Sequence, residues 1–171
     1  YSGEYNDGVK SGIGTLTLND ISKYEGEFRD NHIEGVGKMI FKDGRTYMGN
    51  WKNNKMSGYG IMTWFEEKGK SVLYRHSISN KEMKFYEGEF YDDAKHGAGV
   101  MYKDGKYYIG VWNHNKLEGE VLVIDTKKDK NGIMNNLKNS QYKNGKHIRD
   151  LETKSSYLKL AVEMGYIKNI F

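Results

Sequence analysis

A tyrosine-led pattern that recurs five times constrains the fold of this chain more than any other feature. The stretch YEGEF begins at Tyr24 and again at Tyr86. Every copy has a glycine two residues after its tyrosine, an aromatic residue four after it and a glycine eleven after it, and all but the last have another glycine thirteen after it. Fixed internal spacing of this kind is typical of an array of small, similar units. The copies begin at Tyr1, Tyr24, Tyr47, Tyr86 and Tyr108.

The sixth and seventh positions after each tyrosine predict a tight turn in the middle of each copy. These positions hold pairs such as Asp30-Asn31, in which Asp, Asn, Gly and His predominate. A two-residue type I′ turn needs positive φ at both central residues, which Gly, Asn and Asp tolerate best. Each copy is therefore predicted to be a β-hairpin, and a second turn such as Asp43-Gly44 is expected to join one copy to the next.

Continuous antiparallel pairing across that turn predicts which residues face one another. We expect the fourth and ninth positions after the tyrosine to pair, the second and eleventh to pair, and the tyrosine itself to face the thirteenth. All of these side chains then point to one face, and each tyrosine ring lies over a glycine whose missing Cβ leaves room for it. The ninth position is apolar in Ile33, Met56 and Leu117, whereas Lys10 and Lys95 stand there in the other copies, and their stems are expected to cover a ring.

This pattern resembles the MORN repeat (membrane occupation and recognition nexus), whose consensus is close to YEGEWKNGKxHGxG. The resemblance covers residues 1–125 as five repeats starting at residues 1, 24, 47, 86 and 108, with a long insertion at about 66–85. Residues 126–150 are interpreted as a degenerate, basic sixth repeat and residues 151–171 as a C-terminal helix and tail. The resemblance implies a mainly β protein with an elongated single antiparallel sheet of stacked β-hairpins and an aromatic groove along one face.

The C-terminal segment predicts a short α-helix over residues 155–164. Tyr157, Leu160, Ala161 and Met164 recur with helical spacing on one side of this segment. A helix of this length is marginal alone, so we expect it to cap the open sheet edge or to cover an apolar patch on the reverse face of the fourth and fifth copies. That patch consists of Ala98, Val100, Tyr102, Ile109, Val111, Leu122 and Ile124.

Composition excludes several classes of site. The chain has no Cys, which excludes a disulfide scaffold and a thiolate zinc site, and it has no apolar run long enough for a membrane span. The five His lie on predicted turns or outward positions without metal-ligand spacing, and the Glu-x-Glu pairs point away from the aromatic face, where solvated charge is the expected role. We therefore expect no catalytic residues, no metal and no cofactor. Because the sequence begins with Tyr rather than Met, it is expected to be a piece of a longer protein.

The aromatic face is the predicted partner site. Methionines and aromatic residues at the fifteenth and seventeenth positions extend it into a soft apolar strip that a single sheet cannot bury fully. We predict that it binds a helix or an extended peptide of a partner protein. The alternative is that this layer only packs on itself. The predicted groove residues are Tyr24, Phe28, Met39, Phe41, Tyr47, Trp51, Met62, Trp64, Tyr86, Phe90, Met101, Tyr108 and Trp112.

The charge is divided unevenly along the chain. Residues 1–125 hold 17 Lys and Arg against 19 Asp and Glu, whereas residues 126–171 hold 10 against 4. Basic residues near an anionic leaflet contribute about 1 kcal/mol each, so the C-terminal region is a candidate membrane-binding element. The alternative is that it is a solvated basic stretch that keeps the end of the array soluble. Nucleic acid is not an expected partner, because the aromatic and basic residues lie in different segments. The candidate lipid-binding residues are Lys127, Lys128, Lys130, Lys143, Lys146 and Arg149.

Together these features predict a non-catalytic scaffold in a cytoskeletal, ciliary or membrane-associated assembly. The expected location is intracellular: the cytoplasm, the cytoskeleton or cilium, or the cytoplasmic membrane face. One alternative is a membrane-targeting module with the phosphoinositide affinity reported for the family. Another is a regulatory arm of a larger enzyme, since the family includes lipid kinases and a histone-lysine methyltransferase. The identity of the partner and the oligomeric state are left open.

Overall fold

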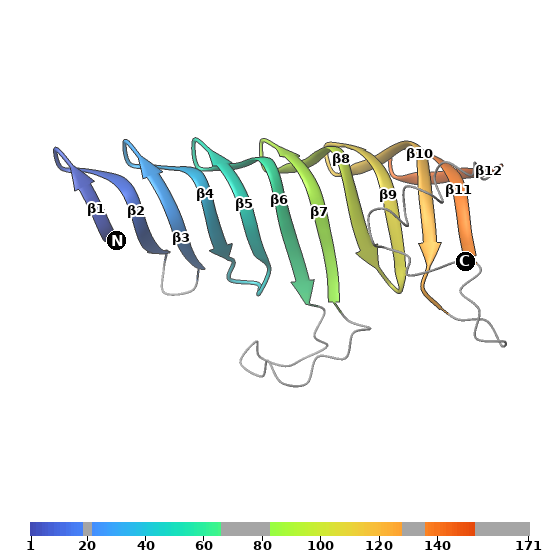
Figure 1. The fold of residues 1–171 in the computed structure, drawn as a ribbon, viewed down its shortest axis with the longest axis horizontal. Coiled ribbons are helices and arrows are strands. Elements are labelled where there is room, and N and C mark those ends of the chain that lie inside the picture. Colours follow the sequence, from blue (N-terminus) through green and yellow to red (C-terminus); the bar gives the residue numbers. More distant parts are fainter. Residues whose placement is uncertain (19–21, 66–82, 128–135, 153–171) are drawn as a thin grey trace, which may run out of the picture.

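The computed structural model describes residues 1–18, 22–65, 83–127 and 136–152. These residues form one antiparallel sheet of 12 strands, whose spatial order is the order of the sequence. Figure 1 shows the strands side by side along the long axis, with β1 at one end and β12 at the other. The predicted mainly β architecture with a single open sheet is confirmed. No helix occurs in the described ranges, and the helix predicted at 155–164 lies outside them.

The sheet consists of six consecutive hairpins, each made of an odd-numbered strand and the even-numbered strand that follows it. The strands are β1 (Ser2–Asn6), β2 (Val9–Leu18), β3 (Ser22–Arg29), β4 (His32–Ile40), β5 (Thr46–Lys52), β6 (Lys55–Phe65), β7 (Met83–Tyr91), β8 (Ala94–Lys103), β9 (Lys106–Asn113), β10 (Lys116–Asp125), β11 (Asn136–Lys143) and β12 (Lys146–Leu151). Within the described part of the chain, no helix is long and apolar enough to cross a membrane.

The predicted turn chemistry is confirmed in every hairpin. Both central residues have positive φ, for example 48° at Asp30 and 65° at Asn31, as a type I′ turn requires. The second turn residue also bonds to the preceding hairpin. Asn54 donates its backbone N–H to the carbonyl of Ile33 at 3.0 Å, and its side-chain Oδ1 accepts the Ile33 N–H at 2.8 Å. The turns therefore align neighbouring hairpins as well as closing their own.

The predicted cross-strand register is correct at the turn and wrong beyond it. Phe28 faces Ile33, as expected, but Gly26 faces Gly37 rather than Gly35, and Tyr24 faces Met39 rather than Gly37. Two residues along β3 thus correspond to four along β4, and this defines a β-bulge at residues 34–36. Corresponding shifts occur in the first, third and fourth hairpins. Continuous pairing was the wrong assumption.

A glycine in the left-handed region makes this bulge possible. Gly35 has a φ of 61°, and the equivalent glycines of the other four repeat copies also have positive φ, a conformation that other residues rarely adopt. Since the shift is by two residues, the alternation of side chains between the faces is preserved. The prediction of one aromatic face therefore holds despite the wrong register.

The reverse face is apolar near its C-terminal end. Val100, Leu122 and Ile124 are buried there, whereas Val111 is half exposed. The helix that we expected to cover this patch lies outside the described residues.

Candidate functional site: the aromatic face of the sheet

Each leading tyrosine of the second, third and fourth hairpins is fully buried against its own hairpin. A Cβ at Gly37 would lie 2.1 Å from Oη of Tyr24, so the ring occupies the space above that glycine. The Tyr24 hydroxyl donates to the carbonyl of Glu27 at 3.1 Å. Burial, and next the nearby Glu27 carboxylate, raise the pKa of Tyr24 to about 12. The predicted tyrosine-over-glycine packing is confirmed, although the ring reaches the glycine diagonally rather than directly across the pair.

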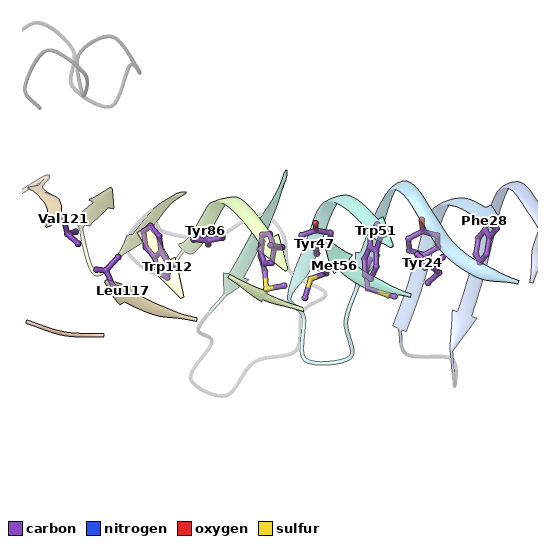
Figure 2. Packing of buried hydrophobic residues seen from close by; sticks show 13 residues of the cluster. Tyr24, Phe28, Tyr47, Trp51, Met56, Tyr86, Trp112, Leu117 and Val121 are labelled. Carbon is purple, nitrogen blue, oxygen red and sulfur yellow. The ribbon is translucent and has the colours of Figure 1, made fainter. Parts of the chain in front are cut away.

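The rings form a continuous edge-to-face row along the sheet (Figure 2). Tyr47 packs between Trp51 of its own hairpin and Phe90 of the next, with centroid separations of 5.1 and 5.0 Å. Tyr24 and Tyr86 repeat the arrangement with their own neighbours. Such pairs are worth about 0.5–1.5 kcal/mol each beyond burial of area. The row is the core of the sheet and joins one hairpin to the next.

Acidic side chains on the reverse face support the bulge. The Glu27 carboxylate accepts the N–H of Val36 at 2.8 Å, and Glu89 accepts the N–H of Ala98 at 3.2 Å. A Cβ at Gly35 would lie 2.4 Å from the Glu27 carboxylate. The interpretation of the Glu-x-Glu pairs as solvated charge fits Glu25, which is half exposed beside Lys23, but it misses this structural role of the second glutamate.

The predicted groove residues separate into two groups by burial. Nine lie in the interlocked layer and are at most 7% exposed: Tyr24, Phe28, Met39, Tyr47, Trp51, Met62, Tyr86, Phe90 and Trp112. The other four pack against that layer and are only partly buried: Phe41, Trp64, Met101 and Tyr108. We call these four residues the exposed strip. A partner in contact with this face meets the exposed strip first, because the nine others are covered by one another.

A hollow of about 410 Å³ opens beside the exposed strip. Trp64 and Met101 supply its apolar surface, and charged side chains supply the remainder. The Lys95 ammonium lies 5.2 Å from the centroid of the Trp64 ring and 5.6 Å from that of Tyr86, so its charged end as well as its stem is held over the aromatic layer. The lining residues are Asp43, Arg45, Trp64, Lys84, Lys95, Met101 and Lys103.

The basic side of this hollow was missed at the level of sequence, although a signal for it existed. Lys95 and Lys103 stand at the ninth and seventeenth positions of the fourth copy, where the third copy has Met56 and Trp64. Each substitution by itself is an ordinary surface lysine. Both lysines lie on β8, and only the packing of β6, β7 and the β4–β5 turn beside that strand makes them part of one hollow.

The candidate lipid-binding residues are dispersed. Lys143, Lys146 and Arg149 are exposed on β11 and β12, where Arg149 donates to the Gln141 side chain at 2.9 Å. Lys127 is exposed after β10. Lys128 and Lys130 lie outside the described residues. Within the described ranges no three His, Cys, Asp or Glu side chains gather in a way that could hold a metal ion.

Comparison with known protein families identifies four copies of one motif in this chain. The family model described as MORN repeat matches residues 1–20, 24–44, 47–65 and 86–107. Each range covers most of one of the first four hairpins, and the last range ends at the beginning of β9. A comparison with curated proteins found no match.

Proposed function

Since this chain is a MORN-repeat protein, we propose that it is a non-catalytic scaffold holding a helix or an extended peptide of a partner protein against its aromatic face. MORN repeats form a non-catalytic repeat family, and they are consistent with a protein that acts through protein or membrane interactions. We propose that the protein acts in a cytoskeletal, ciliary or membrane-associated assembly, in the cytoplasm or on the cytoplasmic face of a membrane.

The observation that carries this proposal is the partial exposure of the four apolar residues of the exposed strip. Phe41 and Trp64 lie beyond the buried row of rings on the side of the sheet opposite the I′ turns, and Met101 and Tyr108 pair with each other across β8 and β9. No second layer of described elements covers this face (Figure 1). Partly exposed apolar side chains beside a hollow are typical of an interaction site, and Met and aromatic side chains adapt well to a peptide.

The test compares two sets of substitutions that leave the buried row intact. Phe41→Ala with Trp64→Ala removes the N-terminal half of the exposed strip, whereas Lys143→Gln, Lys146→Gln and Arg149→Gln neutralise the exposed basic residues of the last hairpin. We expect a partner captured from native extract, then purified, to lose affinity for the first variant and to keep it for the second. A partner that binds the strip variant as tightly as the unaltered protein would contradict the proposal. Matching thermal midpoints are the control for folding.

A second candidate, anionic-membrane targeting, is supported by the exposure of Lys143, Lys146 and Arg149 on one hairpin. Binding of this kind depends on several exposed charges and should collapse at raised ionic strength, whereas binding to an apolar strip should weaken little. Co-sedimentation with vesicles containing phosphatidylserine, with and without added salt, separates the two candidates. Salt-sensitive binding lost in the triple Gln variant would favour the membrane.

A further inference from the structure

Lys95 occupies a position that is apolar in the second, third and fifth hairpins, where Ile33, Met56 and Leu117 stand, and that is a lysine, Lys10, in the first. It faces Phe90 across the fourth hairpin, just as Met56 faces Trp51 in the third and Ile33 faces Phe28 in the second. Its ammonium lies over the Trp64 and Tyr86 rings at the wall of the hollow. A cation has therefore replaced an apolar contact within the aromatic layer.

No described carboxylate compensates this cation. The structure gives Lys95 two ring contacts and no ion pair with any described residue. Burial, followed by the charge of Lys103, lowers the pKa of Lys95. Half-burying an ammonium group is costly unless an anion approaches it. The site is thus prepared for a negative charge that the described part of the chain does not supply.

The other charges around the hollow have nearby partners. Arg45 donates from Nε to Oδ2 of Asp43 at 2.7 Å and stacks on Phe41, and Lys84 lies 3.7 Å from the Asp104 carboxylate. The lining as a whole holds four cations and one carboxylate, so the potential inside it is positive.

We propose that this hollow receives an acidic side chain, Asp or Glu, from the partner segment. The carboxylate lies beside the Lys95 ammonium, and an apolar neighbour in the same segment packs on Trp64 and Met101. This inference rests on the proposed function, which it deepens by specifying that the partner segment has an acidic residue beside an apolar one. Charge complementarity selects the partner and the exposed strip supplies contact area.

A peptide carboxylate fits the hollow better than the phosphate groups of a lipid. Phosphate recognition favours a guanidinium that donates two bonds in parallel, and the one arginine here already donates to Asp43. The Asp43 carboxylate in the lining would also repel a multiply charged headgroup. A single carboxylate matches one uncompensated lysine in charge.

The test is a selection of peptides from a random library displayed on phage, performed on the unaltered protein and on Lys95→Met. Methionine is the residue at the same position in the third hairpin, so Lys95→Met should fold and its thermal midpoint should not fall. We expect the unaltered protein to enrich Asp or Glu beside apolar residues, and Lys95→Met to lose that enrichment. A selected acidic peptide should bind Lys95→Met at least about tenfold more weakly.

Two matched variants make the result specific. Lys10→Met makes the same change at the equivalent position of the first hairpin, where the lysine lies over Tyr1 outside the hollow, and it should bind the peptide normally. Lys95→Arg retains the charge and should retain the acidic enrichment.

Several outcomes would overturn the inference, and they differ in whether the proposed scaffold function also fails. If the selected peptides show no acidic preference but fail to bind the Phe41→Ala, Trp64→Ala variant, the scaffold function stands and the Lys95 assignment falls. Acidic enrichment that persists in Lys95→Met would place the selectivity elsewhere. If no peptide is selected, both proposals fall. The last experiment measures binding to vesicles of phosphatidylcholine with phosphatidylserine. If this binding depends on Lys95 and no acidic peptide is selected, the hollow is assigned to a membrane instead.

Discussion

The third and fifth hairpins have the same cross-strand register but bury their leading tyrosines to different extents. In the third hairpin Gly60 leaves space for the Tyr47 ring, which is fully buried. In the fifth hairpin Val121 stands in the place of that glycine and is itself fully buried, and Tyr108 is only partly buried. The register shift is nevertheless retained between Glu118 and Leu122. The bulge therefore does not require the tyrosine-over-glycine packing, and the glycine decides where the ring lies.

The residue that supports the bulge also differs between these two hairpins. Asn50 in the third donates from its side chain to the Tyr59 carbonyl at 2.9 Å, whereas the fifth has Val111 at this position. A Cβ at Gly119 would meet nothing within 4 Å, since no carboxylate folds over it. Three substitutions and one pH titration test this comparison by measuring the stability of the protein.

The largest effect is expected from Gly60→Val, which gives the third hairpin the residue of the fifth. The new side chain would collide with Tyr47, because a Cβ alone would lie 2.5 Å from its ring. We expect the free energy of unfolding to fall by about 3 kcal/mol or more, since the ring must leave its contacts with Trp51 and Phe90. Denaturant unfolding measures the change. A loss below about 1 kcal/mol would show that the ring can move aside as Tyr108 does.

The second largest effect is alkaline destabilisation through Tyr47. Burial, and next the charge of Asp93, raise the pKa of Tyr47 well above its usual value of 10.0. A group whose pKa is higher in the folded state contributes stability below its unfolded pKa and loses it as the pH rises toward the folded value. Stability should therefore decline above about pH 10, and Tyr47→Phe should reduce that decline. Chemical denaturation at a series of alkaline pH values provides the test, and an identical decline in Tyr47→Phe would refute it.

A smaller effect is expected when the same hydroxyl is removed at neutral pH. The Tyr47 hydroxyl donates to the Asn50 carbonyl at 2.9 Å, and a buried bond of this kind is worth about 1 kcal/mol. Tyr47→Phe should cost about that amount. Tyr108→Phe is the matched control and should change stability by less than about 0.5 kcal/mol, because its hydroxyl bonds to no described residue. Equal losses at the two sites would contradict the distinction drawn between the hairpins.

The smallest effect is expected from Asn50→Val, which copies Val111 of the fifth hairpin. It removes one exposed hydrogen bond at the bulge, so we expect a loss of about 0.5–1 kcal/mol and no change of register. Amide hydrogen exchange of β5 and β6 follows both properties. Loss of protection throughout the two strands would mean that the side chain is required for the bulge, and would break the analogy with the fifth hairpin.

Much of the fold could be predicted from local chemistry. The Asp, Asn and Gly pairs at the turns require positive φ, and alternation along each strand assigns the rings to one face. The register could not be predicted by counting residues, because a bulge interrupts the ladder in each hairpin. Gly35 was assigned to pairing, whereas its real role is to adopt a left-handed conformation beneath the Glu27 carboxylate.

The candidate site was less predictable than the fold. The sequence places thirteen apolar residues on one face but contains no measure of how far each ring covers its neighbour. Tyr47 and Trp64 look equivalent as aromatic side chains, yet one is fully buried and the other lines a hollow. Lys95 is an exception to the repeat in sequence, and only its contacts with Trp64 and Tyr86 make it a candidate for recognising an anion.

The sequence by itself determined the repeat, the hairpins, their turns and the single aromatic face, because each of these follows from interactions between residues close together in the chain. Tertiary structure alone decided the accessible part of the face and the basic hollow. These depend on packing between hairpins, in which the ring of one copy covers the next and side chains from the β4–β5 turn, β6, β7 and β8 meet at one place.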